Sequence, residues 1–199
     1  MKKIFTTLFL ITIITTSAVA NNMELIPKLG FLFSPELTQR PEEEKAISNS
    51  KDSALSLGAE LFFDMNNNFF LGFGIMWGQN HKFNSLSANK IGFTNIYGEL
   101  KYKLLVNTSQ NDSLFIYPLV QLGFGAPGWE YNGYHLNYTI EGLGYWGLGA
   151  GCEYKNIIFE LIYGCDYAVE KYIQSDHRDF KNDLTYTAFR INIGYKFNL

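Results

Sequence analysis

The residues in this chain with the types needed for catalysis are histidines that have serines near them in the sequence. They are His81, His135 and His177, with Ser85, Ser87 and Ser175. A histidine beside a serine can act as the base that activates a hydroxyl nucleophile. No spacing here matches a nucleophile motif, and a histidine in a polar segment is usually only solvated. The sequence therefore predicts no catalytic residue and no enzyme.

Charged residues form a second set, because they recur at alternate positions within apolar segments. They are Lys28, Glu60, Asp64, Glu99, Lys101, Lys103, Glu153, Glu160, Asp166, Arg190 and Lys196. At this spacing the charges of one segment share a single face of a strand. Such a face could line a selective pore or a proton relay, or it could form a packed interior in which cations and carboxylates pair. We expect the packed interior, because an isolated buried charge is costly.

The packed-interior interpretation predicts one specific contact, and the sequence offers one candidate cation site. We expect Arg190 to contact at least one of four carboxylates: Glu60, Glu99, Glu153 or Glu160. The segment SDHRD (175–179) could hold a cation, but a charged loop tip is the simpler interpretation. The sequence therefore predicts no metal ion and no cofactor.

The position of the predicted hairpin turn decides whether the two cysteines can form a disulfide. If KN (155–156) is a tight turn, Cys152 lies opposite Phe159 and Cys165 lies opposite Trp146. Phe159 and Cys165 are then roughly 20 Å apart along one strand. A disulfide needs Cα atoms within about 7 Å. We therefore expect both cysteines to be free and to lie on the apolar face.

The elements that would position these residues are β-strands, because a two-residue period replaces any helical period after residue 22. The terminal stretch AFRINIGYKFNL shows it plainly, with apolar or aromatic residues at every second position from Phe189 to Phe197. Aromatics make up 17% of the chain, which favours strands. We predict eight strands: 23–34, 53–64, 69–80, 92–106, 113–125, 141–154, 157–169 and about 189–197.

The connections between these strands alternate in length. Long polar segments are predicted at 35–52, 81–91, 126–140 and 170–183, and short turns at MNNN, NTSQND and KN. This rhythm is typical of outer-membrane barrels, which have short periplasmic turns and longer outer loops. Residues that face each other across a hairpin share a side of the sheet. We expect Tyr154 to face Ile157 and Phe63 to face Phe69, each an apolar pair.

The apolar face of the strands points either to lipid or to an interior. In a soluble barrel or sandwich the many large aromatics would crowd an eight-stranded interior, and glycines would lie on a solvated surface without benefit. The reversed arrangement puts glycine and charge inside, and strands of this length can cross the apolar layer when tilted. The sequence therefore predicts an all-β fold, an eight-stranded antiparallel up-and-down transmembrane β-barrel.

The N-terminus has the pattern of an export signal. Lys2 and Lys3 precede an apolar run over 4–14, and SAVA (17–20) supplies small residues before a cleavage point. We predict a cleaved signal peptide at 1–20 and a barrel at 21–199. The formal net charge of −3 argues against a nucleic-acid partner.

With its signal segment, eight alternating strands and terminal GYKF, the chain resembles the small eight-stranded outer-membrane β-barrel family, the opacity and porin-like superfamily. The resemblance implies that the outer-membrane assembly machinery reads the last strand. That signal maps to Ile193, Gly194, Tyr195 and Phe197. The family usually stops at the aromatic residue, whereas here Asn198 and Leu199 follow.

These patterns lead to an expected function. We expect a monomer in the bacterial cell outer membrane, in contact with its lipid, with a structural or adhesin-like surface-interaction role. Paired charges would plug the lumen, and an extracellular partner would bind through 35–52 and 126–140. A narrow porin-like channel for small or apolar solutes is the alternative, and a lipid-modifying enzyme is a weaker one.

Overall fold

The structure is a computed structural model that describes residues 23–40, 46–49, 53–65, 68–82, 88–109, 112–131, 136–173 and 179–199. The expected signal peptide lies outside these residues, as do His135, His177 and the three serines near the histidines. Among the described residues, no helix is long and apolar enough to cross a membrane.

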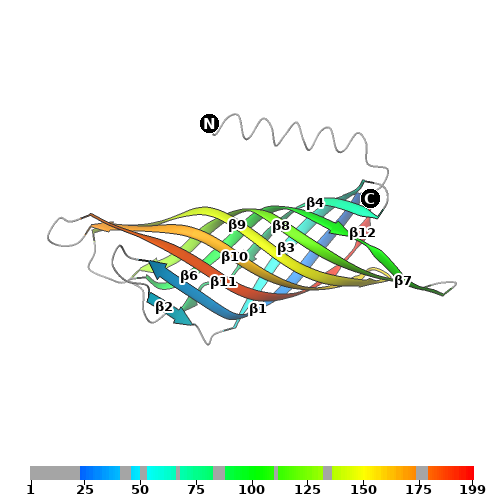
Figure 1. Ribbon diagram of the computed structural model, residues 1–199, viewed down its shortest axis with the longest axis horizontal. Coiled ribbons are helices and arrows are strands. Elements are labelled where there is room, and N and C mark those ends of the chain that lie inside the picture. The colour runs from blue at the N-terminus through cyan, green and yellow to red at the C-terminus, as the bar shows by residue number, and fades with distance from the viewer. Residues whose placement is uncertain are drawn as a thin grey trace.

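Eight long strands form one closed antiparallel ring, as the alternating pattern predicts (Figure 1). The ring is β1–β3–β4–β6–β8–β9–β10–β11 and closes through the pairing of β11 with β1. Shorter strands extend it: β2 and β12 pair with β1, β5 with β6, and β7 with β8. The strands are β1 (Met23–Arg40), β2 (Ala46–Asn49), β3 (Ala54–Asp64), β4 (Phe69–Gly78), β5 (His81–Lys82), β6 (Ala88–Tyr102), β7 (Leu104–Ser109), β8 (Asp112–Tyr131), β9 (Leu136–Tyr154), β10 (Ile157–Ile173), β11 (Asp179–Tyr195) and β12 (Phe197–Asn198).

The strands are staggered around the ring. Paired residues can be followed from Ile26 of β1 once around the wall, and the path returns to β1 at Leu37 rather than at Ile26. A barrel with such a stagger has tilted strands and an interior just wide enough for side chains. The stagger therefore makes the lumen a packed core.

The inside-out arrangement of side chains is confirmed. Ile191 and Ile193 are 44% and 48% exposed on the outer surface, whereas Arg190 and Asn192 between them are 7% and 0% exposed. In the other long strands too, apolar side chains face outward and alternate with side chains that face the lumen. An apolar belt therefore surrounds the barrel. Interior-polar and exterior-apolar alternation is the pattern of a barrel in lipid.

Two hairpin registers can be compared with the sequence predictions. Tyr154 pairs with Ile157, as expected from the KN turn. Phe63 pairs with Leu71 rather than with Phe69, so the predicted register of the β3–β4 hairpin was wrong by two residues. Because the shift is an even number, each side chain stays on its predicted face.

The predicted long loops at the outer end were too long. Strands β1, β8, β9, β10 and β11 continue into segments that were predicted to be loops, over 35–40, 126–131, 136–140, 170–173 and 179–183. Polar residues in these stretches hide the alternation, because beyond the lipid the outer face no longer has to be apolar. The C-terminus and the β7–β8 hairpin lie at one end of the barrel and β2 at the other (Figure 1). The end with the C-terminus and the short turns is the periplasmic one.

Inside the wall, apolar clusters alternate with polar layers. One cluster lies low in the barrel and includes Ile26, Phe62 and Ile158. A larger one lies toward the outer end and joins residues of β1, β6, β10 and β11, among them Phe93 and Leu184.

Candidate functional site

The lumen contains the charged residues, and its first layer lies at the periplasmic end. Lys103 lies 2.8 Å from Glu153 and 3.1 Å from Glu24. Lys196 forms ion pairs with the same two carboxylates. Two cations thus balance two carboxylates within one layer. Glu24 was not among the predicted charges, although its alternation with Ile26 and Lys28 could have placed it there.

A second layer lies deeper and is closed to solvent. The ammonium group of Lys28 lies between Glu60 and Glu160 and pairs with both, at 2.5 Å from Glu160. Lys101 lies 3.5 Å from Glu99 and 3.6 Å from Glu160. All five side chains have no exposed surface. A buried ion pair is tolerated only when further hydrogen bonds satisfy the remaining polar atoms.

Neutral side chains supply several of these hydrogen bonds. The Tyr97 hydroxyl donates to Glu60 at 2.7 Å, and the Tyr117 hydroxyl donates to Glu160 at 3.0 Å. Gln121 donates its amide to Glu99 at 2.6 Å and accepts from Tyr145 at 2.5 Å. The sequence predictions did not include these four residues, because they are uncharged. Their inward parity in the strands was the available signal.

Three carboxylates of this layer lie close enough together to raise the question of a metal ion. Ligand oxygens of Glu60, Glu99 and Glu160 all lie within 4.8 Å of one another. Lys28 and Lys101 are in ion-pair contact with these same carboxylates. Lysine ammonium groups therefore supply the positive charge that a metal ion would supply, and the arrangement fits a charge network better than a metal site.

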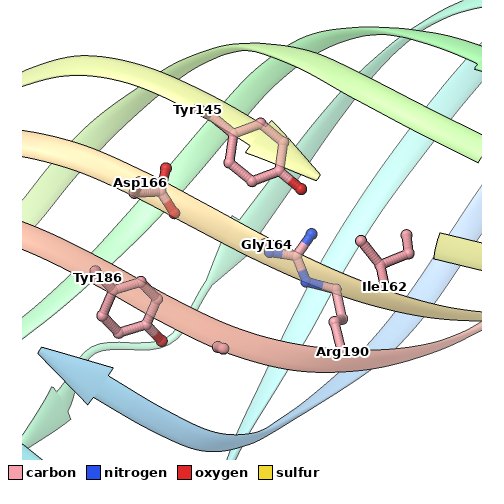
Figure 2. A pocket seen from close by; sticks show the side chains of 7 residues that line it. Tyr145, Ile162, Gly164, Asp166, Tyr186 and Arg190 are labelled. Atoms are coloured by element: carbon pink, nitrogen blue, oxygen red, sulfur yellow. The ribbon is translucent and has the colours of Figure 1, made fainter. Parts of the chain in front are cut away.

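A third layer lies above, around Arg190 (Figure 2). Arg190, Asp166, Tyr145 and Tyr186 line a cavity of about 10 Å³, roughly the size of one water molecule. Asn95 donates a hydrogen bond to Asp166 at 3.4 Å. The guanidinium Nε and Nη1 atoms of Arg190 are buried without a hydrogen-bond partner.

The expected contact of Arg190 with a glutamate was wrong. None of the ion pairs or hydrogen bonds among the described residues joins Arg190 to the four predicted carboxylates. Arg190 instead lines the cavity with Asp166. The reason is the stagger of the strands, which puts residues of neighbouring strands at heights that sequence order does not reveal.

Glu170 is an interior polar residue that sequence reasoning missed. It is completely buried and accepts hydrogen bonds from Gln39, Tyr138 and Asn182 at 2.6–2.8 Å. Sequence reasoning missed it because it falls in the segment 170–183 that was predicted to be a loop. Glu170 ties β10 to β1, β9 and β11 beyond the predicted end of the barrel.

The remaining predicted residues are placed as follows. Asp64 is half-buried at the periplasmic end of β3. Cys152 and Cys165 are both free and pair across β9 and β10 with Phe159 and Trp146, as expected. His81 lies in β5, at the outer end of the wall.

The residues of the expected assembly signal lie in the last strands. Ile193, Gly194 and Tyr195 end β11, and Phe197 of β12 pairs with Leu25 of β1. The Leu199 amide donates to the carbonyl of Met23 at 2.9 Å, so the extra residues continue the sheet.

This closed ring, its apolar belt and its charged interior define a transmembrane β-barrel of the bacterial outer membrane. No family model matches the chain, and no curated protein matches it. Among solved structures, the solid-state NMR structure of the outer membrane protein AlkL in lipid bilayers is similar, with a TM-score of 0.56 and 13% identity. The similarity covers 90% of this chain and 92% of that one.

Two further structures match with lower scores. Neisserial surface protein A has a TM-score of 0.40 and 11% identity over 88% of this chain and 97% of that one. The Yersinia pestis outer membrane protein Ail in a phospholipid nanodisc has a TM-score of 0.39 and 14% identity over 87% and 99%. At 13% identity, the similarity to AlkL supports the fold alone.

Proposed function

We propose that this protein is a non-enzymatic outer-membrane barrel with a closed lumen, which presents its outer extension to a partner outside the cell. The observation that carries the proposal is the filled interior. Among the described residues, three charged layers and three clusters of apolar and aromatic side chains occupy the lumen between the periplasmic turns and the outer end. Their side chains come from all eight strands, so they interlock across the barrel.

The second layer would block an axial path for ions most effectively. Tyr117 is 2% exposed and Phe62 is 0% exposed, and the Lys101 ammonium lies 3.6 Å from the centre of the Phe62 ring. The side chains of these paired charges have no exposed surface, which supports a lumen that is closed at this level. A passing ion would have to separate ion pairs inside a medium of low dielectric constant, which is costly.

The outer extension supports the surface-interaction part of the proposal. Beyond the pair Gly123–Tyr145, strands β8 and β9 are no longer paired with each other, although β8 still pairs with β6 and β9 with β10. The outer apolar cluster packs between these two groups of strands. An extension with its own apolar core is suited to presenting the segments 35–52 and 126–140.

Conductance of the purified protein in planar bilayers tests the closed lumen. We expect no stable ohmic steps from the wild-type barrel. A Phe62→Ala/Tyr117→Ala variant removes the two rings of the second layer and should show small steps. Regular conductance by the wild type would contradict the proposal and favour a narrow channel.

Attachment of cells that display the protein tests the surface role separately. Replacing 41–45 and 132–135 with glycine–serine segments should lower attachment to matrix proteins or cell layers while the barrel still folds. The same kind of replacement at Lys155 and Asn156, in the described periplasmic turn between β9 and β10, should leave attachment unchanged. If displaying cells attach no better than cells without the protein, the surface role fails while the closed lumen can still hold.

A further inference from the structure

The outer surface carries a groove at the outer edge of the apolar belt. The groove measures about 450 Å³ and runs across β9, β10, β11 and β1. Its lining residues are Arg40, Leu143, Gly144, Tyr167, Ala168, Asp183, Leu184 and Thr185. None of the charged residues of the lumen described above contributes to it, so the groove is separate from that network.

A bulge in β9 shapes this groove. Tyr167 pairs with Gly144 and Ala168 with Gly142, which leaves Leu143 as an extra residue. Leu143 points outward and is 55% exposed. Bulges often redirect a side chain in this way. Gly144 adds depth, because a Cβ placed there would meet no atom closer than 4.0 Å. The result is an apolar channel between Leu143 and Tyr167.

The groove lies at the height of the interfacial aromatic residues. The Trp146 indole donates a hydrogen bond to the Tyr167 hydroxyl at 3.3 Å, and Trp146 packs edge-on against Tyr163 at 5.8 Å. Trp and Tyr rings prefer the boundary between hydrocarbon and headgroups. The groove therefore opens where the acyl chains of the outer leaflet meet their headgroups.

Cations stand just beyond the aromatic residues. Lys171 and Lys181 are direct cross-strand partners, and Arg40 lies in the groove. All three point outward, because their neighbours Gln39, Glu170 and Asn182 point inward, where Gln39 and Asn182 both donate hydrogen bonds to Glu170. Like charges directly opposite on a sheet destabilise it unless an anion offsets them.

The nearby carboxylates offset this positive charge only in part. Glu141 pairs with Lys171 at 2.7 Å. Asp183 lines the groove as the cross-strand partner of Arg40, without forming an ion pair with it. Within the described part of the chain, no carboxylate forms an ion pair with Arg40 or Lys181. These two cations are therefore available to an outside anion.

We propose that this groove binds an anionic outer-leaflet lipid, one whose phosphate group is a monoester with no cationic headgroup attached to it. Its phosphate lies against Arg40 and Lys181, and an acyl chain lies between Leu143 and Tyr167. Two observations select this occupant: the apolar part of the groove is continuous with the lipid-facing belt, and the charge at its outer mouth is complementary to phosphate. A lipid is also the molecule already present at that surface.

Quenching of Trp146 fluorescence by brominated lipid tests the proposal. The full barrel carries Trp77→Phe and Trp129→Phe, so that Trp146 reports alone, and is placed in phosphatidylcholine vesicles. We compare a small fraction of brominated phosphatidic acid with the same fraction of brominated phosphatidylcholine. Phosphatidic acid should quench more strongly, and each of Arg40→Gln and Lys181→Gln should weaken its relative association roughly fivefold.

Matched variants separate the headgroup from the acyl chain. Gly144→Leu fills the groove and should reduce quenching by both lipids, whereas Gly98→Leu, at an equally open outward position on β6, should not. Lys155→Gln removes a cation at the periplasmic turn and should change nothing. Equal quenching by the two lipids, or full competition by inorganic phosphate, would overturn the assignment to an anionic phosphomonoester lipid.

Discussion

The ammonium group of Lys28 shows what a single charge does inside this barrel. It has no exposed surface and pairs with both Glu60 and Glu160. Removing it leaves two buried carboxylates facing each other without their cation. We expect Lys28→Met to destabilise the barrel by about 3–5 kcal/mol, measured by urea unfolding in vesicles.

An exposed ion pair provides the control for this variant. Lys171 and Glu141 form a 2.7 Å pair whose side chains are 45% and 58% exposed. Because solvent screens such a pair, Lys171→Gln should change the free energy of unfolding by no more than about 1 kcal/mol. Equal losses in the two variants would show that the second lumen layer is hydrated and not a packed ion-pair network.

Glycines on the inner face of the wall leave space that aromatic rings occupy. A Cβ on Gly151 would lie 2.5 Å from the Tyr117 ring, and one on Gly72 would contact the Phe62 ring even more closely. We expect Gly151→Val to lower stability by at least about 1–3 kcal/mol through overpacking. Gly98→Val faces outward with free space and should have little effect. The folded fraction on a gel without heating measures both.

At the scale of the strand, the sequence predicted the faces better than the ends. The alternation of Ile191 and Ile193 with Arg190 and Asn192 follows from lipid outside and packed polar groups inside, and a strand has only two faces. The outer limit of β10 was missed because Glu170 and Lys171 are both polar. There one side chain points into the barrel and the other into water, so the chemical contrast between faces disappears.

Contacts between strands were harder to predict than the strands themselves. The register of the β9–β10 hairpin could be predicted because a two-residue turn allows few ways of pairing the strands. The pairing of Phe63 with Leu71 depends on a longer turn, and the environment of Arg190 depends on the stagger of the whole ring. The tyrosines and Gln121 of the lumen give no charge signal at all. Pattern therefore predicts which side a residue faces, and only the closed barrel determines which residues meet.

The final strand leads to a prediction about assembly. We expect the assembly machinery to read Phe197, which pairs with Leu25 and is 48% exposed. Phe197→Ser should reduce the amount of folded protein in the outer membrane, measured by heat-dependent gel mobility. Leu199→Ser should have a smaller effect, because Leu199 lies beyond β12 and bonds to Met23 through its backbone amide, which the substitution keeps. The opposite order would move the signal to the last residue.

At the scale of the whole molecule, the two cysteines report how the barrel lies in the bilayer. Cys152 belongs to the outward set of β9 and is half-buried, and Cys165 belongs to the outward set of β10 and is covered by its neighbours. Both lie within the apolar belt, so lipid should surround Cys152 and neighbouring side chains should cover Cys165. In vesicles, a water-soluble maleimide should label neither thiol until the protein unfolds.

A lipid-soluble maleimide distinguishes the two thiols, because it reaches the belt from the hydrocarbon. It should label Cys152 in the folded barrel and leave Cys165 largely unmodified. Lys155→Cys, placed at the periplasmic turn in a Cys152→Ala/Cys165→Ala background, should react with the water-soluble reagent and confirm access to that end. Rapid labelling of Cys152 from water in the folded protein would mean that the outward face of β9 meets solvent, and the barrel could not then lie in lipid with its apolar belt.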